Sequence, residues 1–269
     1  MRLLTLFLFV FGSVYGEMAI PENAGDSLRT LIVSNGPDAL IEYIEKFDPP
    51  QRLQLYQLAR EVIVFSVWEG QNLDDIAAVS GAGIAEAMGQ ANNAPNSLAT
   101  IALLDLANVM SYNLSADLAE CWPGDTLIRH DRHFERGLSA ALQCVTWRYE
   151  LDKGDYSLFI AFQAAGMHQL SLGRPEEAVY NLVSSLNHAQ QYTVDQGRPL
   201  GLTSEAGYEL ILAHGYLGLA MEMCGSDDDQ YERAIRAFEE GFEKYPELAD
   251  DYRFGIAQLQ WAREQLRIE

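Results

Sequence analysis

Two apolar stripes with helical spacing occupy residues 213–245, and they constrain the fold more than any other feature of the chain. Apolar or small residues lie at offsets 0, 4, 7, 8 and 11 from Ala213, and at offsets 0, 3, 4, 7, 11 and 14 from Tyr231. Each set forms one face of an α-helix. A short polar turn joins the two helices into an antiparallel hairpin. Neither stripe covers the other completely, so the hairpin needs neighbouring helices.

Similar periodicity runs through the rest of the chain, while the alternation typical of strands is nearly absent. Glycine, proline and aspartate punctuate the pattern, and Pro95-Asn96-Ser97 separates two apolar runs and gives the second a capping residue. We therefore expect an all-α protein. The predicted helices span 24–34, 37–47, 50–69, 73–92, 96–119, 131–151, 156–172, 175–195, 203–224, 229–244 and 247–267.

The hairpin at 213–246 resembles the tetratricopeptide repeat (TPR) family. The residues that carry the resemblance are Leu217, Gly218, Ala220, Gly225, Ala234, Phe238, Gly241 and Pro246. An upstream copy consists of Gly166, Leu172, Gly173, Glu176, Glu177, Ala178, Leu182 and Ser185. The match is best over 155–246 and weak over 50–150. Gly137 lies at a small position of one such weaker unit, and small residues at Ser80–Gly83 are expected to let two helices approach closely.

The resemblance implies stacked helical hairpins forming an α-solenoid, closed by a C-terminal capping helix within 247–269. The turn glycines Gly70, Gly124, Gly173 and Gly225 are 54, 49 and 52 residues apart. This spacing is wider than the family's usual period of about 34 residues. We therefore expect about four hairpins with longer helices and longer links. In the capping helix, Tyr252, Ile256, Leu259 and Leu266 should face the stack, and Glu247, Asp250, Asp251 and Glu264 should face water.

The first 16 residues have the features of a signal peptide. Arg2 precedes an apolar run from Leu3 to Val10 or Phe11, and Val14 and Gly16 fit the small positions of a cleavage site. The processed chain would be one helical domain, 17–269, in the periplasm or secreted, without a membrane-spanning helix. The alternative is a buried N-terminal helix.

The formal net charge of −21 argues against nucleic acid and anionic lipid as partners. Cleavage after Gly16 would remove one basic residue, Arg2, and leave −22. Cys121, Cys144 and Cys224 are too few for a disulfide framework. All three lie among apolar residues, and we expect them in the core.

Several residue clusters invite a chemical role, but each has a simpler structural interpretation. Asp227–Asp229 lacks the glycine and glutamate of an EF-hand loop and is better explained as a helix cap. His130, Asp131 and His133 have metal-ligand chemistry but no nearby third ligand. His168 and His214 fit as packing residues. We expect no metal, cofactor or catalytic residue. Asn113 opens a glycosylation sequon whose use stays open.

In the resembled family, the first helix of each hairpin lines a concave face that binds peptides or proteins. Carried over by position, the implied lining residues are Gln163, Met167, Leu170 and Ser171 in one unit, and Leu212, Leu219, Glu222 and Met223 in the next. We therefore expect a non-catalytic protein that binds a partner protein or peptide. One alternative is a solute- or cofactor-binding component of an envelope transport or assembly system. Another is a metal-dependent enzyme built around His130 and His133. The terminal helix would fill the concave face if it folded against it.

Overall fold

The computed structural model describes residues 20–65, 68 and 70–266, and over these ranges the protein is all-helical, as predicted. The predicted signal peptide and Glu17 lie outside the described residues. The described elements are α1 (Ala24–Ile44), α2 (Pro49–Phe65), α3 (Leu73–Asn92), α4 (Ser97–Leu118), α5 (Asp131–Glu150), α6 (Asp155–Ser171), α7 (Pro175–Asp195), α8 (Tyr208–Met223), α9 (Gln230–Lys244), the 3₁₀ turn η1 (Pro246–Leu248) and α10 (Ala249–Gln265).

Most helix boundaries follow the local signals in the sequence. The side chain of Asn96 accepts a hydrogen bond of 3.0 Å from the Ala99 amide and caps α4, as predicted. Gly36 has φ +82° and ψ −178°, which breaks α1 between the two predicted segments. The four predicted turn glycines all have positive φ, between 68° and 86°.

Two boundaries differ from the predictions by four residues or more. Helix α2 ends at Phe65, and the side chains of Trp68 and Gln71 donate hydrogen bonds to the Ile63 carbonyl near that end. Helix α8 begins at Tyr208, five residues after the predicted start, because Gly207 has φ +91°. The Ser204 carbonyl before it accepts a hydrogen bond of 3.1 Å from the Tyr252 hydroxyl. Side-chain contacts of this kind satisfy backbone groups that a longer helix would have paired.

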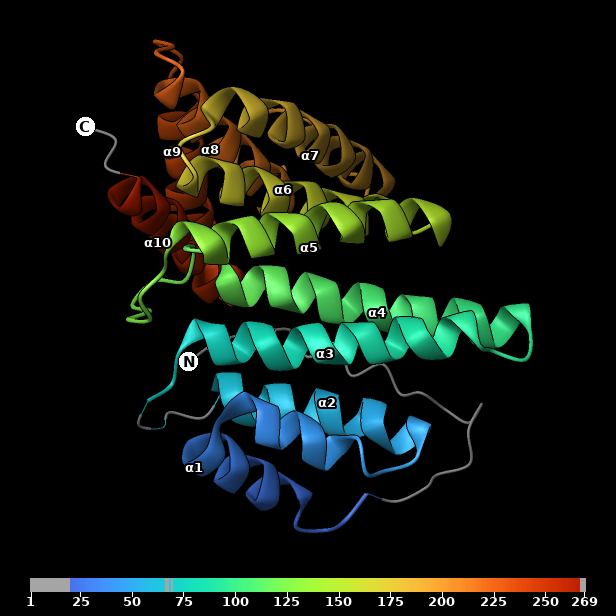
Figure 1. Cartoon of the computed structure of the whole chain (residues 1–269). Helices are drawn as coiled ribbons and strands as arrows, with labels where there is room; N and C mark the ends of the chain where they lie inside the picture. The colour runs from blue at the N-terminus through green and yellow to red at the C-terminus, as the bar shows by residue number, and fades with distance from the viewer. Residues whose placement is uncertain (1–19, 66–67, 69, 267–269) are drawn as a thin grey trace.

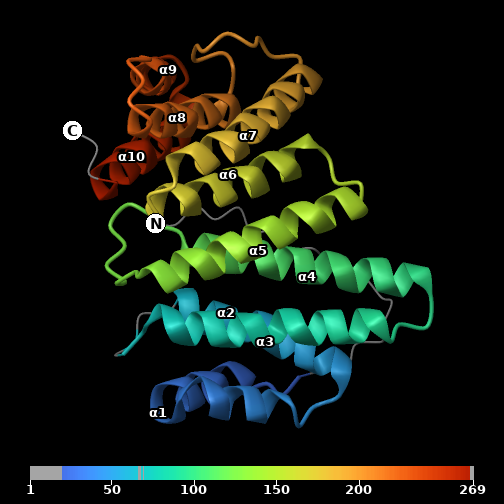
Figure 2. The same cartoon turned by 45° about the horizontal axis from the view of Figure 1, so that its top comes forward.

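Consecutive helices pack side by side along the chain (Figure 1). Helices two positions apart also touch, namely α1 with α3, α3 with α5, α4 with α6, α6 with α8 and α8 with α10. Figure 2 shows the same succession from α1 to α7, with α8, α9 and α10 grouped at one end. The even-numbered helices from α4 to α10 therefore form a continuous set of neighbours.

Small residues allow the closest helix crossings. A Cβ atom on Gly83 would lie 2.3 Å from the Met110 side chain, so α3 and α4 meet closely there, as expected from the small residues at 80–83. A Cβ atom on Gly137 would lie 2.1 Å from the His168 ring, which packs α5 against α6. The flexible end of Met110 could move away from a methyl group at position 83, whereas the fully buried His168 ring has little room to do so, so the crossing at Gly137 is the stricter requirement for glycine.

Helix α10 covers α8 and α9 at the end of the chain. Tyr252 and Leu259 are buried, and Ile256 and Leu266 pack against the same core. The four acidic residues predicted to face water, Glu247, Asp250, Asp251 and Glu264, are exposed. The predicted orientation of this helix is confirmed.

One expectation about the cysteines is wrong. Cys121 and Cys144 are buried, but Cys224 is exposed. Cys224 caps the C-terminus of α8, where the chain turns away at Gly225. Its side chain lies beyond the last buried turn of the helix, so apolar neighbours in the sequence do not translate into burial.

No helix within the described ranges is long and apolar enough to span a membrane.

Candidate ligand-binding cavity

A cavity of about 260 Å³ lies among α2, α4, α6, α8 and α10 and is called the inner cavity below. Helix α6 contributes the longest stretch of its wall, from Tyr156 to Met167. Aromatic side chains from every side line it: Phe65, Tyr112, Trp122, Tyr156, Phe159, Tyr208 and Phe254. Trp122, in the loop after α4, approaches Phe254 of α10, with ring centroids 6.3 Å apart. Such a wall favours an apolar or aromatic ligand group.

The charged groups at the inner cavity are neutralised within the protein. Arg60 of α2 donates two hydrogen bonds of 2.8 Å to Asp117 of α4. Arg129 donates one of 2.9 Å to Asp125. Glu209 lies 3.6 Å from Arg198. The Arg60–Asp117 pair is bidentate and the Arg129–Asp125 pair is buried, so both hold their geometry and leave little net attraction for a charged ligand.

A buried arginine supports the wall behind Tyr112. The Arg148 guanidinium lies 4.8 Å from the centre of the Tyr112 ring. Its Nε donates 3.1 Å to the Asn108 side chain, and an Nη donates to the Ser157 carbonyl. Burial raises the pKa of Tyr112 above its ordinary value despite the nearby Arg148. The phenol therefore stays protonated and remains a hydrogen-bond donor.

Gln163 is a polar residue in this aromatic wall that retains hydrogen-bonding capacity. It is 7% exposed, and its Oε1 has no hydrogen-bond partner among the described residues. Its Nε2 lies 3.9 Å from the Met167 sulfur, a weak acceptor. An unpaired buried acceptor costs about 1–3 kcal/mol, so this amide is a position where a ligand donor would bind favourably.

The predicted lining residues fall into two groups. Gln163, Met167 and Leu212 line the inner cavity. Met167, Leu170 and Ser171 also face a gap of about 10 Å³, which Ala262 and Leu266 of α10 close. Leu170 and Leu219 are buried, and Met223 packs against the same core.

Helix α10 accounts for this division. Leu259 packs against Gly215, and Arg263 lies 3.2 Å from the Glu222 carboxylate. Helix α10 therefore packs along the part of α8 that carries Gly215 and Glu222, as expected if the terminal helix folds against the concave face, while Leu212 still lines the inner cavity. Leu219 is fully buried, so replacing it with aspartate would bury an unpaired charge and disturb the core. A loss of binding in such a variant would not show that Leu219 contacts a partner.

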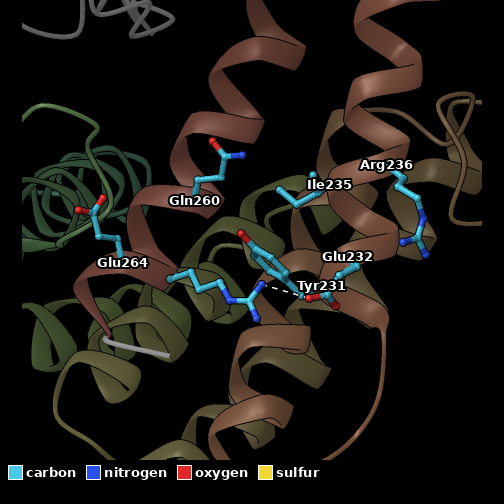
Figure 3. Close-up of a pocket in the computed structure, with 7 residues that line it drawn as sticks. Tyr231, Glu232, Ile235, Arg236, Gln260 and Glu264 are labelled. Carbon is cyan, nitrogen blue, oxygen red and sulfur yellow. Dashed lines mark hydrogen bonds and ion pairs between the residues drawn. The ribbon is translucent and has the colours of Figure 1, made fainter. Parts of the chain in front are cut away.

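A second, wider cleft of about 530 Å³ lies between α9 and α10. Figure 3 shows Tyr231, Ile235 and Arg236 on one side and Gln260 and Glu264 on the other. Arg263 lies 4.6 Å from the centre of the Tyr231 ring and 3.1 Å from the Glu232 carboxylate. We call this the outer cleft. Its rim is charged, and none of the predicted lining residues belongs to its wall, although its Arg263 pairs with Glu222.

The histidine pair at the start of α5 has a structural role. The Nδ1 of His133 accepts a hydrogen bond of 3.1 Å from the His130 amide, and its Nε2 lies 3.0 Å from Asp74 of α3. Arg132 donates two further hydrogen bonds to the same carboxylate. Both ring nitrogens of His133 are therefore used: Nδ1 holds the first turn of α5, and Nε2 ties α5 to α3.

The acidic turn also differs from its predicted role. Asp229 is the N-cap of α9 by position, but its side chain accepts no capping hydrogen bond among the described residues. Its carboxylate instead lies 4.0 Å from Arg233 and 3.5 Å from Arg236. The positive charges one and two turns into α9 attract the carboxylate away from the helix terminus.

The Asn113 sequon lies inside α4. Asn113 lines the inner cavity, and Ser115 is fully buried. A glycosylated sequon needs an accessible surface segment. The position of this one argues against its use.

His168 is fully buried between α4, α5 and α6. Its Nε2 lies 3.0 Å from the Ser115 carbonyl oxygen, which only accepts, so Nε2 carries the proton. Its Nδ1 has no partner among the described residues. Burial lowers the pKa of His168 to about 4. The ring is neutral at neutral pH and packs as predicted.

This depressed pKa predicts a loss of stability in acid. Below about pH 6.5 the unfolded chain takes up a proton at His168, while the folded chain resists until about pH 4. We expect this residue to contribute a loss of about 2–3 kcal/mol in unfolding free energy between about pH 7 and about pH 4.5. Urea denaturation of the native protein and His168→Gln at both pH values measures it. Equal pH dependence in the two proteins would contradict the assignment.

The sequence interpretation missed most of the aromatic wall. Tyr112, Trp122 and Phe254 lie in segments that do not belong to the two best-matching units. Trp122 follows directly after α4 and precedes Pro123, so the sequence marks it only as part of a turn. An aromatic residue beside a helix-breaking proline was the available signal, but its spatial neighbours are far away in sequence.

No protein-family model, curated protein or solved structure matches the chain. The inner cavity and its residues are therefore the features that bear on function.

Proposed function

We propose that the chain is an exported, non-catalytic interaction protein built as a TPR-like α-solenoid. It binds a segment of a partner protein or peptide in the inner cavity. The observation that carries this proposal is the aromatic wall, to which α4, α6, α8 and α10 all contribute. Helical-hairpin repeats present successive first helices on one shared face in this way.

The helix contacts support the solenoid arrangement. Each helix packs against the next one, and α4, α6, α8 and α10 form a row of neighbours. Small residues lie where the resemblance requires close packing, as at Gly166, whose Cβ would lie 2.5 Å from Leu182. The contacts of the row join one proposed hairpin to the next, and Gly166 packs the two helices of a single hairpin together, as a solenoid would require.

The size of the inner cavity favours a peptide over a cofactor. Its volume of about 260 Å³ is smaller than the roughly 300–1,000 Å³ of typical small-molecule sites. One large side chain fits this space. The acidic surface of the protein favours a partner with Lys or Arg near that side chain, and association should be faster at low salt.

The binding proposal predicts a difference between two matched phenylalanines. Phe254 lines the inner cavity, while Phe242 on α9 does not, and both are 38% exposed. We expect Phe254→Asp to remove captured partners from an extract of the native compartment and Phe242→Asp to retain them. Circular dichroism checks that both variants keep their helix content. Identical captured proteins for the two variants would place binding elsewhere.

The export proposal predicts a processed N-terminus. Native protein should begin at Glu17, because the apolar run and the small residues Val14 and Gly16 form a complete signal-peptide pattern. N-terminal sequencing of protein from the periplasm or medium measures this. Protein that retains Met1 and stays in the cytosol would contradict it.

A further inference from the structure

The inner cavity matches a single aromatic side chain in size and in chemistry. Its volume of about 260 Å³ leaves room for one large ring system. Tyr112, Tyr156, Trp122 and Phe254 supply ring faces and edges from four different elements. Aromatic rings gain about 0.5–1.5 kcal/mol from such neighbours beyond the area they bury. An inserted ring would therefore bind better here than an aliphatic chain of equal size.

Gln163 adds a requirement for a hydrogen-bond donor. Its Oε1 is buried and has no partner among the described residues. Its Nε2 makes only the weak 3.9 Å contact with the Met167 sulfur. Because Oε1 itself is inaccessible, binding requires the amide to turn about its last side-chain bond, which breaks only the weak contact with Met167, a residue that also lines the inner cavity. A donor on the inserted ring would satisfy this acceptor.

We propose that the inner cavity binds a tryptophan side chain of the partner, with its indole N–H donating to Oε1 of Gln163. The inference rests on the proposed function, and it names the anchor that this function requires. The indole nitrogen only donates, which matches an unpaired acceptor. Phenylalanine has no donor, and the tyrosine hydroxyl brings an acceptor that also needs a partner. A cationic anchor is disfavoured because Asp117 and Asp125 already pair with Arg60 and Arg129.

The test compares indole with 1-methylindole, which has the same ring system but no N–H. Each is titrated into the isotope-labelled processed chain, and backbone amide shifts are followed by NMR. We expect saturable shifts in α4 and α6, with indole binding about fivefold to tenfold more tightly, as one hydrogen bond predicts. Equal affinities for the two compounds would overturn the role of Gln163.

Two variants assign the discrimination to one residue. Gln163→Met keeps a long side chain but removes the acceptor, and it should bind both compounds with the native affinity for 1-methylindole. Gln260→Met changes a glutamine of the outer cleft and should retain the native preference. A preference that persists in Gln163→Met overturns the assignment, as do shifts confined to α9 and α10.

The experiment also separates this inference from the proposed function. If neither compound binds, the tryptophan anchor is wrong, while partner capture that depends on Phe254 would leave the proposed function intact. If indole binds with the expected preference and no captured protein depends on Phe254, the cavity assignment holds and the proposed function fails.

Discussion

Replacing Phe238 with alanine is expected to lower the free energy of unfolding by about 3–5 kcal/mol. Phe238 is fully buried in α9. Its ring lies 5.4 Å from the Tyr208 ring and 6.1 Å from the Tyr252 ring, measured between centroids. It also fills the space above Gly255 of α10, where a Cβ atom would lie 2.7 Å from it. Alanine would leave a cavity that three helices share.

Phe242 provides the matched control for this substitution. It lies one turn further along α9 and is 38% exposed. Its ring contacts Arg253 at the surface. Phe242→Ala should change the unfolding free energy by less than about 1 kcal/mol. Urea denaturation of both variants measures the difference, and a loss below about 1 kcal/mol for Phe238→Ala would contradict the packing described here.

Gly218→Ala is expected to destabilise the protein by about 3 kcal/mol or more, at the upper end of typical overpacking effects. A Cβ atom on Gly218 would lie 2.4 Å from the backbone nitrogen of Tyr231 and 2.8 Å from its Cα. A flexible side chain could rotate away from such a methyl group, but backbone atoms cannot. Helices α8 and α9 would have to separate.

Gly89 in α3 provides the opposite case. Among the described residues, nothing lies within 4 Å of a Cβ atom at this position. Gly89→Ala should therefore stabilise the protein by about 0.5–1 kcal/mol, because alanine favours the helix. Thermal or urea denaturation compares the Gly89→Ala and Gly218→Ala variants with the native protein.

A Gly218→Ala protein as stable as the native one would show that α8 and α9 are not as close as the structure has them.

The predictions from sequence were most accurate where one residue decides a local conformation. Asn96 caps its helix, and Gly173 and Gly225 adopt the left-handed turns assigned to them. The faces of α10 were also predictable, since apolar residues recur at helical spacing on one side. These features depend on residues within a few positions of each other.

The candidate site was less predictable because burial in α8 is not confined to one face. Residues 210–213 are all buried, and so are residues 215–220. Helices α6, α7, α9 and α10 all pack against α8. The apolar excess of Leu212, Leu219 and Met223 was visible in the sequence, but only Leu212 lines the inner cavity. The fully buried Leu219 shows that an apolar helix face does not identify its neighbour.

Local patterns in the sequence were enough to predict the helices, their turns and the face that the terminal helix buries. Spacing, capping residues and turn glycines act locally and need no knowledge of the rest of the fold. The position of α10 against the end of the predicted lining, and the gathering of Trp122, Tyr112, Phe254 and Gln163 in the wall of one cavity, emerge from the packing of the whole chain. Helical periodicity specifies which side of a helix is buried. It does not specify which distant helix covers that side, because this depends on how all the stripes pack together.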